Sequence, residues 1–282
     1  MLIVAIAGLP GSGKTHWIRE QLTQAQSPIR YFNPGTGSVA IDSIALATAF
    51  PQLQVLTEGQ ESELFATGTD TTTYIELPWH LELSTLEPLL QSLNCQRVAI
   101  MPLTEETKDW ADEVVLGNQA AQDYLSQVES RTSQLQIQRG LLTGEIIDWA
   151  SLTTFWFELI HGAYGEVIRA KAIFDIASGE SIYGDFVAGT VRKMFGETGN
   201  VWRSPTRQDR QLSANQEFVA LDLPQWLEGR PQRFSGFEIV GQDLNKAAIT
   251  QTIKDCCLPE SHIEAYQQQM KQSLQQEENI AP

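Results

Sequence analysis

The chain has 282 residues, of which 19 are basic and 35 acidic, and its formal net charge is −16 at pH 7. This length suits one large or two ordinary domains and allows a substantial core. The acidic balance argues against nucleic acid and anionic lipid as partners, because both are negatively charged. No apolar run approaches the roughly 18 residues that a membrane-spanning helix needs.

Cysteine usage points to a reducing compartment, and we expect a cytoplasmic protein. Cys95, Cys256 and Cys257 are an odd number without the spacing of a disulfide framework. Neighbours on a helix point about 100° apart, so apolar packing explains Cys256 and Cys257 better than a metal pair does. One basic group departs from the acidic charge, and we interpret it as a solvated loop rather than an anion or partner patch: Arg192, Lys193, Arg203, Arg207 and Arg210.

The first predicted element is a strand at 2–7, an apolar run of the kind that is buried on both faces of a parallel sheet. Residues 8–15 follow directly and read GLPGSGKT, the pattern of a phosphate-binding loop. Glycines at Gly8, Gly11 and Gly13 let the backbone curl so that successive N–H groups can point at a polyphosphate.

The end of this loop supplies the charged and hydroxyl groups. Lys14 can reach the terminal phosphates, and the Thr15 hydroxyl can enter the shell of a Mg²⁺ ion. A helix that begins near Lys14 adds the positive end of its dipole at the same place. We therefore expect the nucleotide to be bound by Gly8, Gly11, Ser12, Gly13, Lys14 and Thr15.

The rest of the first half alternates between strands and helices. The apolar runs predict further strands at 53–56, 73–77, 97–103 and 113–116, and amphipathic patterns predict helices near 16–25, 80–93 and 119–133. Such alternation is typical of an α/β fold, a parallel sheet covered on both faces. Ligands bind at the carboxyl ends of such strands, where the phosphate loop falls. We predict a P-loop nucleotide-binding domain over residues 1–150.

The pattern changes near residue 150. From Val167 to Ile176 apolar residues alternate with polar ones, and Arg169, Lys171 and Asp175 share one face. Gly179 then allows a turn into a second run at 181–191, which predicts an antiparallel hairpin.

Strands before helices predict a second, smaller α+β domain at 151–258. Further strands are predicted at 217–223 and 234–240, and Asp243 is expected to cap the helix that follows. The tail at 259–282 is rich in Gln and Glu and is expected to be a helix that frays into disorder.

Four stretches share their motifs with one family: Ile6–Thr15, Asn33–Asp42 followed by Val55–Gly59, Tyr74–Glu76, and Glu166–Lys171 with Ile239–Leu244. In these stretches the chain resembles the CobW-like P-loop GTPases, which join a GTP-binding domain to a small α+β C-terminal domain. The resemblance covers most of residues 1–258. It implies a nucleotide-dependent switch or chaperone-like NTPase that uses Mg²⁺, and a protein client is expected at the C-terminal domain.

The chain departs from the family at three motifs. Where family members carry Cys-X-Cys-Cys, the chain has Gln60–Glu63 without sulfur, so we expect no zinc thiolate site. The segment Leu77–Trp79 replaces a small residue and a glycine that senses the γ-phosphate. At the position of Asn-Lys-X-Asp the chain has Gly117–Gln119, without the aspartate that accepts the two guanine N–H donors. The choice between GTP and ATP therefore stays open.

Two carboxylates are candidate Mg²⁺ ligands. Glu76 ends a predicted strand beside the loop, where it could order Mg²⁺ or the attacking water, although a surface carboxylate fits as well. Asp42 could be a switch-region ligand, but an N-cap for a helix at 43–50 is the simpler interpretation. Lys14 and Glu76 are the catalytic candidates.

Three functions remain open. The first is a slow NTPase that acts as a switch or chaperone-like factor. The second is a small-molecule kinase, since many such enzymes begin with the same loop, but its lid would need paired arginines and residues 120–150 offer only Arg131 and Arg139. The third is a non-enzymatic descendant that binds a protein.

Overall fold

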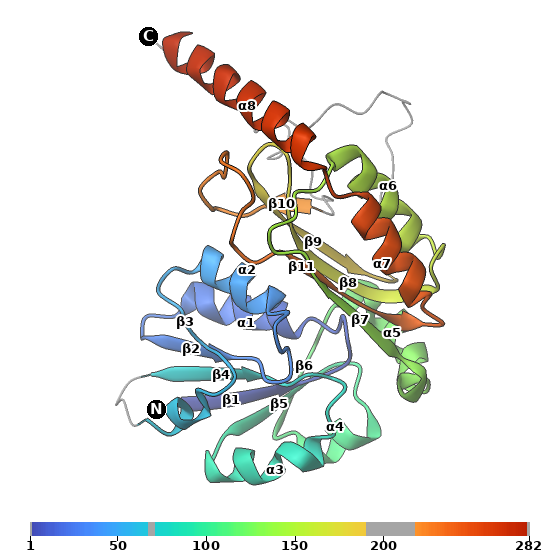
Figure 1. Cartoon of the computed structure of the whole chain (residues 1–282). Coiled ribbons are helices and arrows are strands. Elements are labelled where there is room, and N and C mark those ends of the chain that lie inside the picture. Colours follow the sequence, from blue (N-terminus) through green and yellow to red (C-terminus); the bar gives the residue numbers. More distant parts are fainter. Residues whose placement is uncertain (1, 67–70, 190–217, 281–282) are drawn as a thin grey trace. The chain divides into compact units, whose positions relative to one another are not determined.

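The computed structural model describes residues 2–66, 71–189 and 218–280, and these form two compact units, each with its own sheet (Figure 1). The first unit runs to Leu135, and the second begins at Gln136. The predicted fold class is confirmed: a P-loop NTPase-like α/β unit is joined to a separate unit with an antiparallel sheet.

Six parallel strands form the first sheet, in the order β3-β2-β4-β1-β5-β6. The strands are β1 (Leu2–Ala7), β2 (Ile29–Phe32), β3 (Gln54–Leu56), β4 (Thr72–Glu76), β5 (Gln96–Ile100) and β6 (Glu113–Val115). All five predicted strands are present, and β5 ends before residue 103, because Pro102 has no N–H to extend the ladder. The sequence pattern did not indicate β2, which has only four residues and includes Arg30.

Helices cover both faces of this sheet (Figure 1). The helices of the first unit are α1 (Lys14–Gln24), α2 (Ile41–Ala49), α3 (Leu83–Ser92), α4 (Glu105–Trp110) and α5 (Gln122–Glu129). One core contains alternate β1 residues with Leu83 and Leu90 of α3. The other contains Val4 and Ile6 of β1 with Ile18 of α1 and Leu46 of α2. The apolar run of β1 is thus explained by burial on both faces.

The register of the central strands brings two loops to the same edge. β1 pairs with β4 so that Ile6 lies opposite Glu76, and β1 ends one residue later at Ala7. Because the strands are parallel, the phosphate loop and Glu76 leave the sheet side by side.

Five strands form the second sheet, in the order β10-β9-β8-β11-β7. They are β7 (Gln136–Leu141), β8 (Glu166–Asp175), β9 (Ser181–Val187), β10 (Phe218–Ala220) and β11 (Gly236–Gln242), and the helices of this unit are α6 (Trp149–Ile160), α7 (Lys246–Asp255) and α8 (Glu260–Ile280). The change of pattern at residue 150 therefore comes after the first strand of this sheet. The domain limits at 150 and 258 stay predictions.

The predicted hairpin is formed by β8 and β9, but β8 differs from a half-exposed strand. Only Glu166 of its ten residues is exposed. One face packs against α6, where the rings of Trp156 and Phe174 meet edge to face with centroids 6.4 Å apart. Asp243 is not the cap of the next helix: it has φ 50°, and Asn245 is the N-cap of α7, its side chain accepting from Ala248 N at 3.1 Å.

The charged face of β8 is held by ion pairs and hydrogen bonds. Arg169 donates to the carbonyl oxygen of Phe186 at 2.8 Å and contacts Asp185. Asp175 accepts from Arg233 Nε at 2.7 Å and from Ser181 Oγ at 2.5 Å. These contacts allow charged side chains to be buried in a sheet.

Within the described ranges, no helix has the length and apolar character that crossing a bilayer requires. The basic group at residues 192–210 lies outside the described residues.

Candidate nucleotide-binding site

The predicted phosphate loop connects β1 to α1. Gly11 has φ 82° and Gly13 has φ 104°, a left-handed conformation that other residues adopt only with strain. Gly13 is also the N-cap of α1, so the loop passes directly into a helix N-terminus. Left-handed turns of this kind direct consecutive N–H groups into a concave anion site.

The Lys14 side chain is already fixed by the loop itself. Its ammonium donates to the carbonyl oxygens of Gly8 at 2.7 Å and Leu9 at 3.2 Å, and the residue is only 8% exposed. The positive charge therefore lies against the backbone of the loop.

Thr15, Glu76 and Tyr31 form a hydrogen-bonded group beside the loop. Thr15 Oγ1 donates to both carboxylate oxygens of Glu76, at 2.9 and 3.1 Å, and the hydroxyl of Tyr31 donates to Oε2 at 2.8 Å. Glu76 is 4% exposed and Tyr31 is fully buried. The interpretation of Glu76 as a surface carboxylate is therefore wrong.

Tyr31 is a site residue that sequence reasoning missed. Burial raises its pKa well above the usual value, and the negative charges of Glu76 and Asp42 raise it further, so the phenol stays a neutral donor. The side-chain amide of Asn33, just after β2, lies 3.2 Å from the same phenol oxygen. Only the pairing of β2 with β4, which places Tyr31 opposite Tyr74, could have indicated the contact.

Asp42 lies in the first turn of α2, and Ala40 is the N-cap, so the N-cap interpretation is wrong. Asp42 is 9% exposed, and its charge contributes after that of Glu76 to the raised pKa of Tyr31. Two carboxylates and a threonine hydroxyl are hard oxygen ligands of the kind that Mg²⁺ takes, so the residues present fit that ion. Among the described residues, no group of three or more His, Cys, Asp or Glu is arranged to hold a metal.

The segment at the position of the base-reading motif packs against the phosphate loop. Asn118 N donates to the carbonyl oxygen of Ser12 at 2.8 Å. A Cβ on Gly117 would lie 2.3 Å from that oxygen and 2.5 Å from the carbonyl oxygen of Met101. This segment therefore supports the loop through its backbone. Ser12 Oγ is buried and has no hydrogen-bond partner among the described atoms.

The structure also shows the segments Gln60–Glu63 and Leu77–Trp79, which stand at the positions of the other two motifs. Gln60 precedes a 3-10 turn, η1 (Glu61–Phe65), and its side-chain oxygen accepts from the backbone N–H and the hydroxyl of Thr57, at 2.8 and 2.9 Å. Leu77 extends the β1–β4 pairing by donating to the Ile6 carbonyl oxygen at 2.8 Å. Pro78 follows, and it has no backbone N–H with which to continue the pairing.

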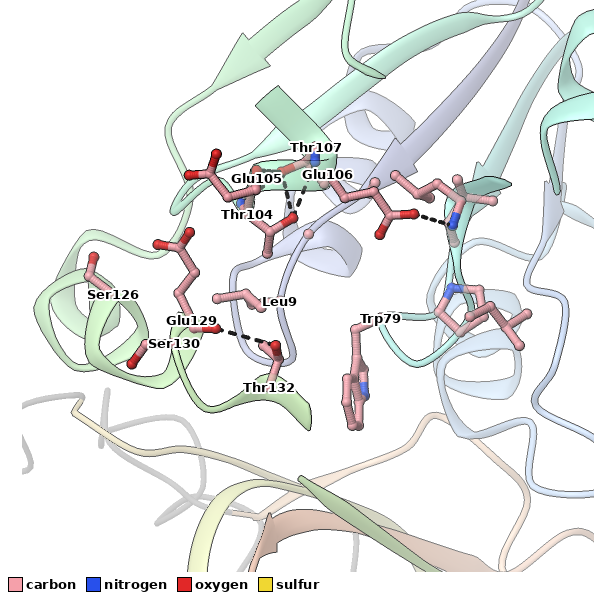
Figure 2. A pocket seen from close by; sticks show the side chains of 16 residues that line it. Leu9, Trp79, Thr104, Glu105, Glu106, Thr107, Ser126, Glu129, Ser130 and Thr132 are labelled. Atoms are coloured by element: carbon pink, nitrogen blue, oxygen red, sulfur yellow. Dashed lines mark hydrogen bonds between the residues drawn. The ribbon is translucent and has the colours of Figure 1, made fainter. Parts of the chain in front are cut away.

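A cavity of about 580 Å³ lies beside the start of the phosphate loop, wholly within the first unit (Figure 2). Gly8 and Leu9 form part of its wall. The segment after β4, the start of α4 and the end of α5 form the rest, and Trp79 is its aromatic member. The volume is typical of small-molecule sites.

Comparison with known proteins gives two solved structures. No family model and no curated protein matches the chain. Zn(II)-bound YjiA GTPase from E. coli is 9% identical, with 91% of this chain and 98% of that chain covered and a TM-score of 0.30. A Zn(II)-bound triple mutant of YjiA is 10% identical, with 90% of this chain and 98% of that chain covered and a TM-score of 0.30. At so low a TM-score and identity, neither similarity bears on what this chain binds.

Proposed function

We propose that the first unit binds a nucleoside triphosphate with Mg²⁺ at Gly8–Thr15 and acts as a slow, nucleotide-dependent switch of CobW-like type. One observation carries the proposal. The Lys14 ammonium is held by the loop carbonyls and the Thr15 hydroxyl by Glu76, which supports their proposed roles as ligands of a phosphate and of its metal ion.

Each residue has a defined task in this proposal. The loop N–H groups and Lys14 bind phosphate oxygens, and Thr15, Glu76 and Asp42 hold the metal ion. The bound Mg²⁺ supplies neutralisation of phosphate charge. Tyr31 keeps the Glu76 carboxylate oriented through its hydrogen bond.

Slow hydrolysis and weak base selectivity are expected from the same geometry. Pro78 removes one backbone donor near the terminal phosphate, and Gly117–Gln119 supplies no carboxylate for guanine. We expect turnover well below the roughly 1–100 s⁻¹ of kinases. We also expect GTP and ATP affinities within about tenfold of each other, or 1.4 kcal/mol.

Calorimetry with Mg²⁺ and non-hydrolysable GTP and ATP analogues tests this proposal. Lys14→Ala should weaken binding at least about tenfold, because a charge-assisted phosphate contact contributes roughly 1.5–3 kcal/mol. Lys254→Ala, an exposed lysine of α7, is the matched control and should bind as the wild type does. Equal affinity in wild type and Lys14→Ala would refute nucleotide binding at the loop. A hundredfold preference for GTP would refute the expectation of weak base selectivity.

A small-molecule kinase is the second candidate, because the cavity adjoins Gly8 and Leu9 of the loop. One of the two arginines available for a lid, Arg139, is instead bound to Glu238 at 2.7 Å in the second sheet. Phosphate transferred to an added small molecule, rather than to water, would favour this candidate.

A further inference from the structure

The cavity beside the phosphate loop has an apolar part that can receive hydrocarbon. Leu9, Leu77 and Leu83 line it and are each at most 5% exposed. In Figure 2 the indole of Trp79 lies on one side of Leu9, and the carboxylates of Glu105 and Glu129 lie on the other. The cavity thus pairs an apolar surface with a charged one, a division typical of sites for amphipathic small molecules.

The charged side of the cavity is negative. Glu105, Glu106 and Glu129 line it, and none of the described residues that line it is Lys, Arg or His. Glu105, whose side chain is 88% exposed, pairs with Lys108, which lies outside the lining, and Glu106 accepts from Leu83 N at 2.6 Å. Hydrogen bonding to Glu105 raises the pKa of Lys108, and the charge of Glu129 adds to the effect. A cavity of this charge concentrates cations and repels phosphates.

Three of the hydroxyls that line the cavity present acceptors. Ser126 Oγ donates to the Gln122 carbonyl oxygen at 2.9 Å, and Ser130 Oγ donates to that of Gln127 at 3.1 Å. Thr132 Oγ1 donates to the Glu129 carbonyl oxygen at 3.2 Å (Figure 2). Because each hydroxyl hydrogen is already used, the oxygen lone pairs are what a ligand can meet. Oxygen acceptors and carboxylates together match the three donors of an ammonium group.

We propose that this cavity binds a small primary amine with an apolar body, its ammonium at Glu105 and Glu129 and its body against Leu9 and Trp79. This inference goes beyond the proposed function and does not depend on it, since Lys14 and Thr15 do not line the cavity. The cavity volume of about 580 Å³ lies in the range of sites that bind free small molecules.

Calorimetry on the full chain without nucleotide tests the proposal, with phenethylamine as the probe and 2-phenylethanol and 3-phenylpropionate as its neutral and anionic counterparts. We expect saturable binding of the amine at millimolar concentration or below. The alcohol should bind at least about tenfold more weakly, because it lacks the charge-assisted hydrogen bonds. The carboxylate should show no saturable binding.

A pair of double variants assigns the amine to the cavity. Glu105→Gln with Glu129→Gln should weaken amine binding at least about tenfold, since it removes both carboxylates that meet the ammonium. Glu20→Gln with Glu113→Gln changes the net charge equally at residues outside the cavity lining and should bind as the wild type does. Trp79→Phe should abolish any change of tryptophan fluorescence on titration. Thermal unfolding of each variant establishes that it is folded.

Three results would overturn the proposal. They are no saturable amine binding to the wild type, equal affinity for amine and alcohol, and undiminished amine binding to the Glu105→Gln/Glu129→Gln variant.

Discussion

Glu76 of the first unit and Asp175 of the second are both almost completely buried, and the two carboxylates differ in what surrounds them. Asp175 of the second unit is 1% exposed and accepts from the Arg233 guanidinium at 2.7 Å. Glu76 of the first unit is 4% exposed and accepts from two hydroxyls, those of Thr15 and Tyr31. A guanidinium compensates the buried charge, which is a structural role. A threonine hydroxyl, by contrast, can itself be a metal ligand.

The comparison teaches that burial alone does not identify a functional carboxylate. Asp175 lies on a sheet face and faces an arginine of its own unit, so its contacts serve the fold. Glu76 lies at the carboxyl end of a parallel strand, next to a helix N-terminus and the phosphate loop. Position at that edge and the kind of donor together distinguish the two roles.

The largest expected effect is on the second unit. Arg233→Met leaves Asp175 buried without its guanidinium and removes two more bonds, to the carbonyl oxygens of Pro224 and Gly179. The free energy of unfolding should fall by about 3–5 kcal/mol, measured by urea denaturation. Arg139→Met, which breaks a more exposed pair with Glu238, should cost clearly less. Equal losses would contradict the structural role of Asp175.

This loss should also depend on pH. Burial raises the pKa of Asp175, against the hydrogen bond of Ser181 and the charge of Arg233, which lower it. Without Arg233 the pKa rises further above its unfolded value, so the folded variant binds the proton more tightly than the unfolded chain. The free energy of unfolding then decreases as the pH rises from the pKa of Asp175 in the unfolded chain to its higher pKa in the folded variant. Denaturation of Arg233→Met at pH 5 and pH 7.5 should show the smaller loss at pH 5.

The second effect is on ligand binding in the first unit. Glu76→Gln should weaken binding of the Mg²⁺–nucleotide complex at least about tenfold, because it removes a charged ligand of the metal ion. The affinity without Mg²⁺ should change little, and the free energy of unfolding should change by less than the loss in Arg233→Met. Calorimetry in the presence of Mg²⁺ and, separately, of EDTA measures the affinity with and without the metal ion. A variant that loses affinity equally in both would indicate a role unrelated to the metal.

Tyr31→Phe should have a smaller effect. It removes one hydrogen bond to Glu76 and keeps the ring in the core, so about 1 kcal/mol is expected, or roughly a fivefold loss of Mg²⁺-dependent affinity. Tyr74→Phe, on the neighbouring strand, is the matched control and should leave affinity unchanged. If both variants lost affinity alike, the core and not the hydroxyl would be responsible.

The smallest effect is expected when the protein is washed with a chelator that removes zinc. Burial raises the pKa of Cys256 to about 12 and that of Cys257 to about 11, so both thiols are protonated near neutral pH. Only thiolates bind zinc strongly. Metal analysis after a chelator wash should find no stoichiometric zinc, and the wash should not shift the unfolding temperature. Zinc that survived the wash would contradict the expectation of no thiolate site.

Local pattern predicted the parts of the fold whose cause is local. The apolar run of β1 predicts a buried strand, and the glycines of residues 8–15 predict a phosphate loop. In both cases the residue type follows from the burial or the backbone conformation at its own position. The alternation of β8 predicted its two faces, yet it could not show that the charged face is buried too, since Arg233 lies 58 residues away from Asp175. The strand of Tyr31 was missed for the same reason.

The errors at helix starts have a common cause. Asp42 and Asp243 are both residues that often cap helices, and both lie within a few residues of a helix start. Capping depends on the backbone of one position, and Asp243 instead adopts φ 50° while Asn245 takes the cap. A sequence pattern locates the helix, and the neighbouring backbone selects the residue.

The contact between Lys14 and its own loop has a consequence for the entropy of binding. A lysine side chain loses up to about 1.5–2 kcal/mol of rotamer freedom when it is immobilised. The carbonyl oxygens of Gly8 and Leu9 already restrict this side chain before any phosphate arrives. A nucleotide therefore meets an ordered charge, and more of the contact energy appears as affinity.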